Sequence, residues 1–158
     1  MKKYILIKSD RQGLFRIKAV QSFGNVKEGE IGGYIEQESN LSHYGNAWVS
    51  GNARVYGDAR VSGNAWVYGN AEVSGNAEVY GNARVYGDAR VSGNADYIVF
   101  KNWWSSGRYF TWTRSNNKWK VGCFYGTGEE LIAKAYKDSE QSGREYERIV
   151  RYVEEILK

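Results

Sequence analysis

The chain of 158 residues contains no proline and only one cysteine, one histidine and one methionine. A single cysteine cannot form an internal disulfide, which favours a reducing, cytoplasmic environment. One cysteine and one histidine are also too few for a typical zinc site. The apolar run near the N-terminus is too short for a signal peptide, and no stretch is long enough to span a membrane. The sequence therefore predicts a cytoplasmic protein without a metal centre, cofactor or membrane segment.

Charge of one sign is not in large excess either. The formal net charge is +4, and the largest positive excess lies in residues 97–158. A dedicated nucleic-acid binder usually carries a larger positive excess on one domain. The absence of proline and of low-complexity tracts argues against long disordered linkers. The length allows one or two compact units.

What the sequence has in abundance is a strict repeat over residues 45–96. Each unit of six residues reads Gly, Asn or Asp, Ala, a variable residue, Val, and Tyr or Ser. A short strict period is typical of a β-solenoid. Side chains alternate across a strand, so each Val and the Ala two residues before it are predicted to point inward. Gly and the Asn or Asp after it are predicted to form the corner, because both tolerate positive φ.

Three sides of six residues close a coil of eighteen, so residues eighteen apart should stack on the outer surface. This places opposite charges above one another, as stacked parallel strands require. The three predicted columns are Trp48, Trp66 and Arg84; Arg54, Glu72 and Arg90; and Arg60, Glu78 and Asp96. Tyr68 should lie under Tyr86, beside the first column.

The units V-Y-G-N-A-R resemble the hexapeptide-repeat, left-handed β-helix family over roughly residues 31–97. The resemblance implies the left hand, and it implies trimers in many relatives. The flanking segments G-E-I-G-G-Y-I-E-Q-E-S-N-L-S and N-W-W-S-S-G-R-Y-F-T-W-T resemble those of uncharacterised phage-encoded repeat proteins. This second resemblance implies a viral protein that works in the cytoplasm of a host cell.

The segments on either side of the repeat are predicted to cap it. Residues 1–30 should form a β-hairpin that covers the first coil, and residues 31–96 the solenoid, beginning with an imperfect coil at Val26, Ile31, Ile35 and Leu41. Residues 97–158 should form a small α+β domain with a strand at 97–101, a hairpin over 108–125 and two helices. Thr127 with Glu130, and Ser142 with Glu145, are predicted capping boxes at the two helix starts.

Three features could carry chemistry. The resemblance implies acyltransferases that use a histidine and coenzyme A, and His43 is the only histidine. We expect His43 to be structural, because it has no obvious orienting partner and the repeat contains no inserted acceptor loop. Cys123 is expected to be a buried structural thiol on a strand. Gly-Thr-Gly before the first helix lacks the lysine and longer glycine pattern of a phosphate loop, so we interpret it as a helix cap.

Two surfaces rich in aromatic and basic residues are the candidate binding sites. Aromatic and arginine side chains typically anchor protein interfaces, and an exposed aromatic patch usually has a partner. Each surface has an alternative interpretation without a partner. The C-terminal aromatic residues could form the core of their domain, and the solenoid ones could stack on one another only to stabilise the coils. The solenoid surface comprises Trp48, Trp66, Tyr68, Arg84 and Tyr86. The C-terminal surface comprises Trp103, Trp104, Arg108, Arg114, Lys118 and Lys120.

The leading hypothesis is a non-enzymatic, phage-encoded binding protein whose target is a host macromolecule, with inhibition of a bacterial defence system such as CRISPR-Cas as a role. An acyltransferase using coenzyme A is one alternative. A protein that binds single-stranded nucleic acid through stacking and phosphate contacts is the other. Self-association into a dimer or trimer is expected, either as the resemblance implies or through the C-terminal helices.

Overall fold

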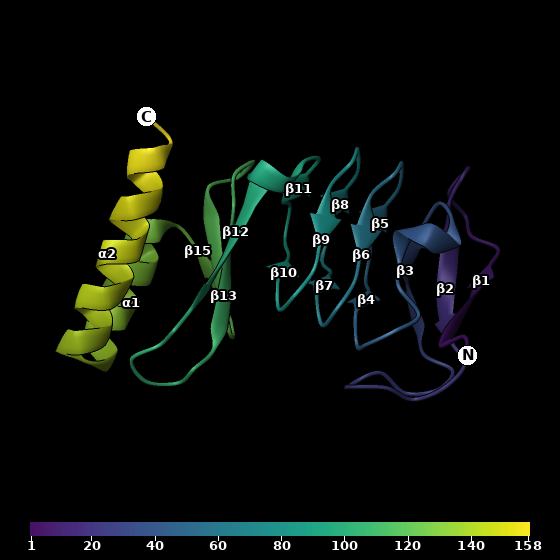
Figure 1. The fold of residues 1–158 in the computed structure, drawn as a ribbon, viewed down its shortest axis with the longest axis horizontal. Coiled ribbons are helices and arrows are strands. Elements are labelled where there is room, and N and C mark those ends of the chain that lie inside the picture. Colours follow the sequence, from purple (N-terminus) through teal and green to yellow (C-terminus); the bar gives the residue numbers. More distant parts are fainter.

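A computed structural model describes all residues, 1–158, as an elongated stack with three parts. An N-terminal hairpin lies at one end, short parallel strands fill the middle, and a sheet covered by two helices closes the other end (Figure 1). The prediction of a β-solenoid with a hairpin at its start and an α+β unit at its end is confirmed. The left hand of the solenoid stays an implication of the resemblance.

Each repeat contributes one two-residue strand, and the strands stack in three parallel sets. The register joins Trp48 to Trp66 and Arg54 to Glu72, each pair eighteen residues apart. The predicted three-sided coil is therefore correct. The solenoid strands are β4 (Trp48–Val49), β5 (Arg54–Val55), β6 (Arg60–Val61), β7 (Trp66–Val67), β8 (Glu72–Val73), β9 (Glu78–Val79), β10 (Arg84–Val85) and β11 (Arg90–Val91).

The core of the solenoid is made of the repeated Val and Ala side chains. All eight Val from Val49 to Val91 are at most 1% exposed, and the Ala residues from Ala47 to Ala89 are fully buried. At the corners only the glycines from Gly45 to Gly87 adopt positive φ, whereas the Asn or Asp that follows does not. Only the glycine therefore uses the positive φ that both residue types tolerate, because one left-handed residue suffices to turn the chain.

The N-terminal hairpin does more than cover the first coil. It comprises β1 (Tyr4–Ile7) and β2 (Phe15–Ala19), and β2 pairs with β3 (Ile31–Ile35), which in turn pairs with β5. The hairpin thus extends one wall of the solenoid into a six-stranded sheet. Val26, Ile35 and Leu41 are buried as predicted, but Ile31 is 44% exposed, because it lies on the outer face of β3.

The hydrogen bonds between coils all run in the same direction, from N–H groups of one coil to carbonyls of the next. The two ends of the solenoid therefore leave different backbone groups unpaired. Backbone N–H groups donate to carbonyls seventeen residues later, as in Arg54 to Ala71. The first coil therefore has free carbonyls and the last coil has free N–H groups. At the N-terminal end, Lys3 Nζ donates to the Ala47 carbonyl at 2.7 Å, and Asn40 Nδ2 donates to the Ala59 carbonyl at 2.8 Å. Buried polar backbone groups are thereby paired.

At the other end, side-chain oxygens accept from the N–H groups that have no following coil. The Arg84 N–H donates to Thr111 Oγ1, and the Glu78 N–H donates to Asn94 Oδ1, both at 2.8 Å. Asp96, predicted to continue a surface column, lies instead in the short helix η2 (Asn94–Asp96). Its carboxylate accepts from the N–H groups of Ser92 and Gly93, because the solenoid has already ended there.

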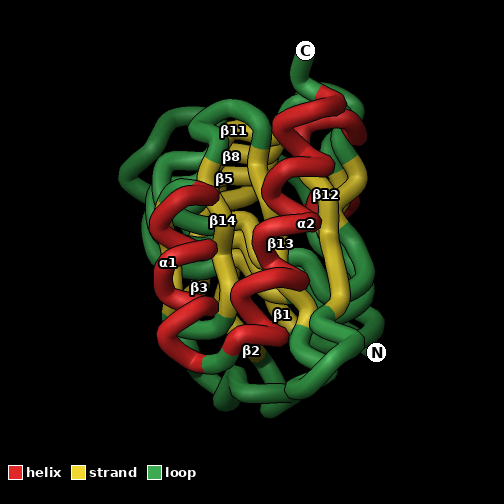
Figure 2. The backbone as a smooth tube through the Cα atoms, turned by 90° about the vertical axis from the view of Figure 1, so that its left-hand side faces the viewer, coloured by secondary structure: helices red, strands yellow, loops and turns green.

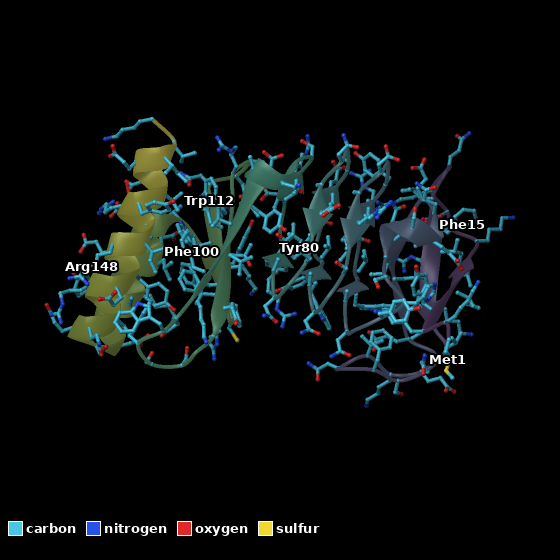
Figure 3. All side chains as sticks on the ribbon, viewed as in Figure 1. Met1, Phe15, Tyr80, Phe100, Trp112 and Arg148 are labelled. Atoms are coloured by element: carbon cyan, nitrogen blue, oxygen red, sulfur yellow. The ribbon has the colours of Figure 1, made fainter.

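The C-terminal unit is a four-stranded antiparallel sheet between the solenoid and two helices (Figure 2). Phe110, Trp112 and Trp119 pack toward the helices, and Tyr97 and Val99 pack against the solenoid. Figure 3 shows Phe100 and Trp112 between the sheet and α2. The second sheet face thus covers the last coil rather than facing solvent. The elements are β12 (Tyr97–Lys101), β13 (Tyr109–Thr113), β14 (Lys118–Val121), β15 (Phe124–Gly126), α1 (Gly128–Asp138) and α2 (Glu140–Ile156).

The helix starts agree with the prediction once and differ once. Thr127 caps α1 and forms the capping box with Glu130. The second helix is capped by Ser139 rather than Ser142. The Ser139 hydroxyl accepts from the Ser142 N–H, and the Ser142 hydroxyl accepts from Trp104 Nε1 at 3.0 Å, so Ser142 serves tertiary packing instead. Neither helix has the length and apolar character that crossing a membrane requires.

Candidate binding surface

Trp48 does not belong to any surface, contrary to the prediction. Its side chain is fully buried under the N-terminal cap. The Phe23 ring meets it edge-on at a centroid distance of 5.3 Å, and the Tyr4 ring lies 6.5 Å away. The first coil has no preceding coil, so the hairpin and the segment after it fold over this end and enclose the indole.

The other aromatic residues of the solenoid surface form a ladder along one edge. The Trp66 ring meets Tyr68 edge-on at 6.1 Å, and the rings of Tyr68 and Tyr86 are 4.5 Å apart. All three side chains are half-buried. The ladder exists because Tyr68 and Tyr86 occupy the same repeat position one coil apart. The predicted stacking of Tyr68 under Tyr86 is therefore correct.

The ladder continues into the C-terminal unit through Tyr125. Its ring meets Tyr86 edge-on at 4.9 Å. The Tyr125 hydroxyl donates to Asp88 Oδ1 at 3.2 Å and accepts from Asn116 Nδ2 at 2.7 Å. This joins the two surfaces that the sequence presented as separate. Tyr125 was missed as a binding residue, although it lies directly opposite Lys120 on the neighbouring strand.

Three cations lie on the faces of these rings. Lys120 Nζ is 4.7 Å from the centroid of Tyr86, and Lys118 Nζ is 5.1 Å from that of Tyr125. The Arg84 guanidinium is 5.5 Å from the Trp66 ring. None of the three has a carboxylate oxygen within 4.0 Å, whereas Arg54 and Arg90 both pair with Glu72. We call this set the aromatic–basic wall; its members are Trp66, Tyr68, Arg84, Tyr86, Lys118, Lys120 and Tyr125.

Burial changes the acid–base properties of the wall. Desolvation raises the pKa of Tyr68 to about 12, so its hydroxyl stays protonated. Desolvation also lowers the pKa of Lys120, with Cys123 opposing and the positive charge of Arg84 adding to that effect. A negatively charged ligand would stabilise the protonated form of such a lysine, since an opposite charge nearby favours the charged state.

The remaining predicted residues lie apart from the wall or beside it. Trp103 is 68% exposed on the loop after β12, whereas Trp104 is half-buried against Tyr146. Arg114 is exposed, and its Nε donates to the Ala95 carbonyl. Arg108 lines a 220 Å³ pocket in the seam between solenoid and C-terminal sheet, together with Tyr68, Asn82, Arg84, Tyr109 and Gly122.

His43 and Cys123 lie far from one another in the chain and in different surroundings. His43 stacks on Tyr4 at 4.0 Å, and its Nδ1 accepts from the Lys3 N–H at 3.2 Å. Its Nε2 is buried without a hydrogen-bond partner, 4.0 Å from Glu38. Burial is the main cause that lowers the His43 pKa. Cys123 is exposed in the turn between β14 and β15, so the prediction of a buried thiol was wrong.

The repeats match a known family over part of their length. The family model described as YdcK beta-solenoid repeat matches residues 53–69 and 77–93. Both stretches lie within the solenoid, so the chain carries β-solenoid repeats of this kind. No curated protein matches the chain.

Proposed function

We propose that the chain is a non-catalytic binding protein whose aromatic–basic wall contacts a macromolecular partner. The main support for this proposal is that Lys120, Lys118 and Arg84 lie over aromatic rings and have no carboxylate oxygen within 4.0 Å. Cations held over aromatic rings on a rigid support favour a partner that supplies negative charge, and Lys120 is in addition partly desolvated. The stacked coils provide that rigid support. The residues of the wall come from two parts of the chain, so the complete surface exists only in the folded protein.

The proposed target is a protein of a bacterial host, and inhibition of a defence system such as CRISPR-Cas is the first role to test. This part of the proposal is supported by the resemblance of the flanking segments to phage-encoded repeat proteins. The proposed stoichiometry is a homodimer or homotrimer in the cytoplasm. Light scattering on the purified protein measures that stoichiometry.

The decisive experiment compares capture of host proteins by three forms of the chain. The wild-type protein is expected to retain a partner that the double variant Arg84→Gln, Lys120→Gln loses. The matched control is the double variant Arg144→Gln, Arg148→Gln, which also removes two positive charges. Both arginines are exposed on α2, and Figure 3 shows Arg148 on the side away from the solenoid. Equal recovery of every captured protein by the wall variant and the control would refute the wall as the contact surface.

Binding of nucleic acid is the second candidate, because three cations without carboxylate partners lie close together. However, Lys120, Lys118 and Arg84 each lie over a face of a ring, where they compete with stacking on bases. Binding would therefore depend on phosphate contacts, and its affinity should fall steeply with salt. Titration of a single-stranded oligonucleotide at two salt concentrations distinguishes this candidate from a protein partner.

The acyltransferase alternative has less support. His43 is held between Tyr4 and the Lys3 backbone, with its free nitrogen buried. A general base must reach the proton that it removes. Calorimetry with coenzyme A tests this alternative directly, and binding that is lost in His43→Ala would favour it over the proposal.

A further inference from the structure

Strand β12 forms an open edge of the C-terminal sheet. The strand order is β12-β13-β14-β15, so β12 has a neighbour on one side only. The opposite edge, β15, has three residues, whereas β12 has five. An edge strand offers unpaired N–H and C=O groups to another chain.

The register determines which backbone groups of β12 are free. The Arg114 N–H donates to the Asp96 carbonyl, and the Asn102 N–H donates to the Arg108 carbonyl, both at 2.8 Å. In an antiparallel pair, every second residue exchanges hydrogen bonds with its opposite number. The even-numbered residues of β12 therefore bond β13, and the odd-numbered ones direct their N–H and C=O groups outward. These outward residues are Tyr97, Val99 and Lys101.

Nothing in the strand itself protects this edge. Its sequence is Tyr-Ile-Val-Phe-Lys, with no proline and with a single charge at the end. Its pairing with β13 runs without a register shift. Soluble proteins usually protect such an edge with central charges, proline, a bulge or a covering segment.

Beside the edge lies a groove of 460 Å³ between β12 and a corner of the last coil. Tyr80 and Asn82 line the solenoid side of this groove, and Tyr97, Val99 and Tyr109 line the sheet side. Tyr80 is 59% exposed, and Figure 3 shows it on the solenoid next to the sheet. A strand added to β12 would place alternate side chains in this groove.

The charges at the two ends of the groove indicate what such a strand should carry. Lys101 lies beside one end, with its Nζ 5.9 Å from the ring of Tyr109, and Glu78 lines the other end, where its carbonyl accepts from the Tyr97 hydroxyl at 2.6 Å. Neither Lys101 nor Glu78 has an oppositely charged group within 4.0 Å. An antiparallel strand would therefore be favoured by an acidic residue opposite Lys101 and a basic residue opposite Tyr97.

A second copy of this chain does not suit the edge. Two β12 strands paired about a two-fold axis would form one continuous sheet with both solenoids on the same face. The corners that carry Tyr80 and Asn82 would then enter the same space from both sides. The groove accommodates a single extended strand without a folded body directly behind it.

We propose that β12 is a docking edge for an extended segment of a partner protein, which adds as a fifth, antiparallel strand. Backbone hydrogen bonds would supply affinity, and the groove and end charges would supply specificity, as in other cases of strand addition. The residues involved lie outside the aromatic–basic wall, so this inference holds or fails independently of the proposed function.

Amide hydrogen exchange on the free protein is the first test. The amides of Ile98 and Phe100 are expected to exchange slowly, because they donate to β13. The amides of Val99 and Lys101 are expected to exchange fast, because they face outward. Equal protection along the whole strand would show that the edge is already covered and would overturn the proposal.

The second test uses the designed peptide acetyl-Thr-Glu-Thr-Val-Thr-Lys-Thr-amide as a probe. In the antiparallel register its Glu lies opposite Lys101, its Val opposite Val99 and its Lys opposite Tyr97. Titration should add protection at Val99 and Lys101 while Ile98 and Phe100 keep theirs. A control peptide with proline in place of the central Val should give no protection. Protection by both peptides, or by neither, would overturn the proposal.

Two variants of the protein complete the test. Val99→Pro removes an outward N–H, which an edge strand tolerates, and should abolish the peptide effect. Lys101→Glu should weaken binding about twofold to fivefold, the size expected for one exposed ion pair. A peptide with Lys in place of Glu and the rest unchanged should restore it, and Lys18→Glu, the same change on exposed Lys18 of β2, should have no effect. Unchanged binding in Lys101→Glu would refute the proposed register even if Val99→Pro failed to fold.

Discussion

The Thr111 hydroxyl oxygen lies 2.8 Å from the backbone nitrogen of Arg84 and accepts its hydrogen bond. In every earlier coil the corresponding N–H donates to a carbonyl seventeen residues later, as Trp66 does to Ala83. A side chain on β13 thus replaces a peptide carbonyl that the ended solenoid no longer provides. The C-terminal sheet is a cap because its side chains complete the hydrogen bonds of the last coil.

Replacing Thr111 with valine should therefore cost stability out of proportion to the size of the change. Thr111→Val keeps the shape of a side chain that is 1% exposed, but it leaves the Arg84 N–H without an acceptor. The expected loss is about 1–3 kcal/mol in the free energy of unfolding. Urea unfolding measures it. Ser115→Ala, which removes the equivalent acceptor for the exposed Arg90 N–H, should cost less.

Two corner glycines should respond differently to alanine. Both Gly45 and Gly81 have positive φ, +70° and +66°, which costs an alanine about 1–2 kcal/mol. A Cβ at Gly45 would also lie 2.6 Å from the Gly63 carbonyl oxygen of the next coil, whereas a Cβ at Gly81 meets nothing within 4 Å. Gly45→Ala should therefore lower the melting temperature more than Gly81→Ala. Equal losses would contradict close stacking of the corners.

The charge column on the second wall should contribute modestly and depend on salt. Glu72 lies between Arg54 and Arg90 and pairs with both, and its side chain is 16% exposed. Glu72→Gln should cost about 0.5–1 kcal/mol at low salt, because it breaks two partly exposed ion pairs. Unfolding at low and high salt measures the difference. Glu78→Gln, in a column without ion pairs, is the matched control and should be nearly neutral.

Lys3 should make stability depend on pH in the alkaline range. Burial lowers its pKa from 10.5 to about 8. Between these values the unfolded chain holds a proton that the folded chain has released, so Lys3 makes stability rise as pH increases through this window. The expected gain is about 3 kcal/mol. Tyrosines with raised pKa values, Tyr68 among them, oppose it above pH 10. The stability difference between wild type and Lys3→Met, measured across this range, isolates the lysine.

The single thiol should react in the native state. Cys123 is exposed in a tight turn, so an aromatic disulfide reagent should modify one thiol per chain without denaturant. Absorbance of the released thiolate measures the stoichiometry, and Cys123→Ser provides the blank. Modification that needs denaturant would show that the turn is covered in solution.

Local regularity made the solenoid predictable. A period of six places Val and Ala inside, and closing three such sides into a coil of eighteen residues sets Trp66 above Trp48 and Glu72 above Arg54. The helix start at Thr127 was also predictable, since a capping box needs only residues three apart. These features depend on contacts that either repeat from coil to coil or join residues close in sequence.

The tertiary structure decided what the repeat cannot encode, namely what covers its two ends. Trp48 and Trp66 are both tryptophans at the same repeat position. The Trp48 side chain is nevertheless fully buried, because the hairpin folds over the first coil. Tyr97 and Val99 face the solenoid, and Lys120 reaches Tyr86, because the C-terminal sheet docks on the last coil. The sequence by itself determined the coil and the columns of its middle part, since each repeat there stacks on another copy of itself. Only the tertiary structure shows how the two end segments cover the solenoid. Each cap is a contact between parts of the chain that are distant in sequence and have no common repeat.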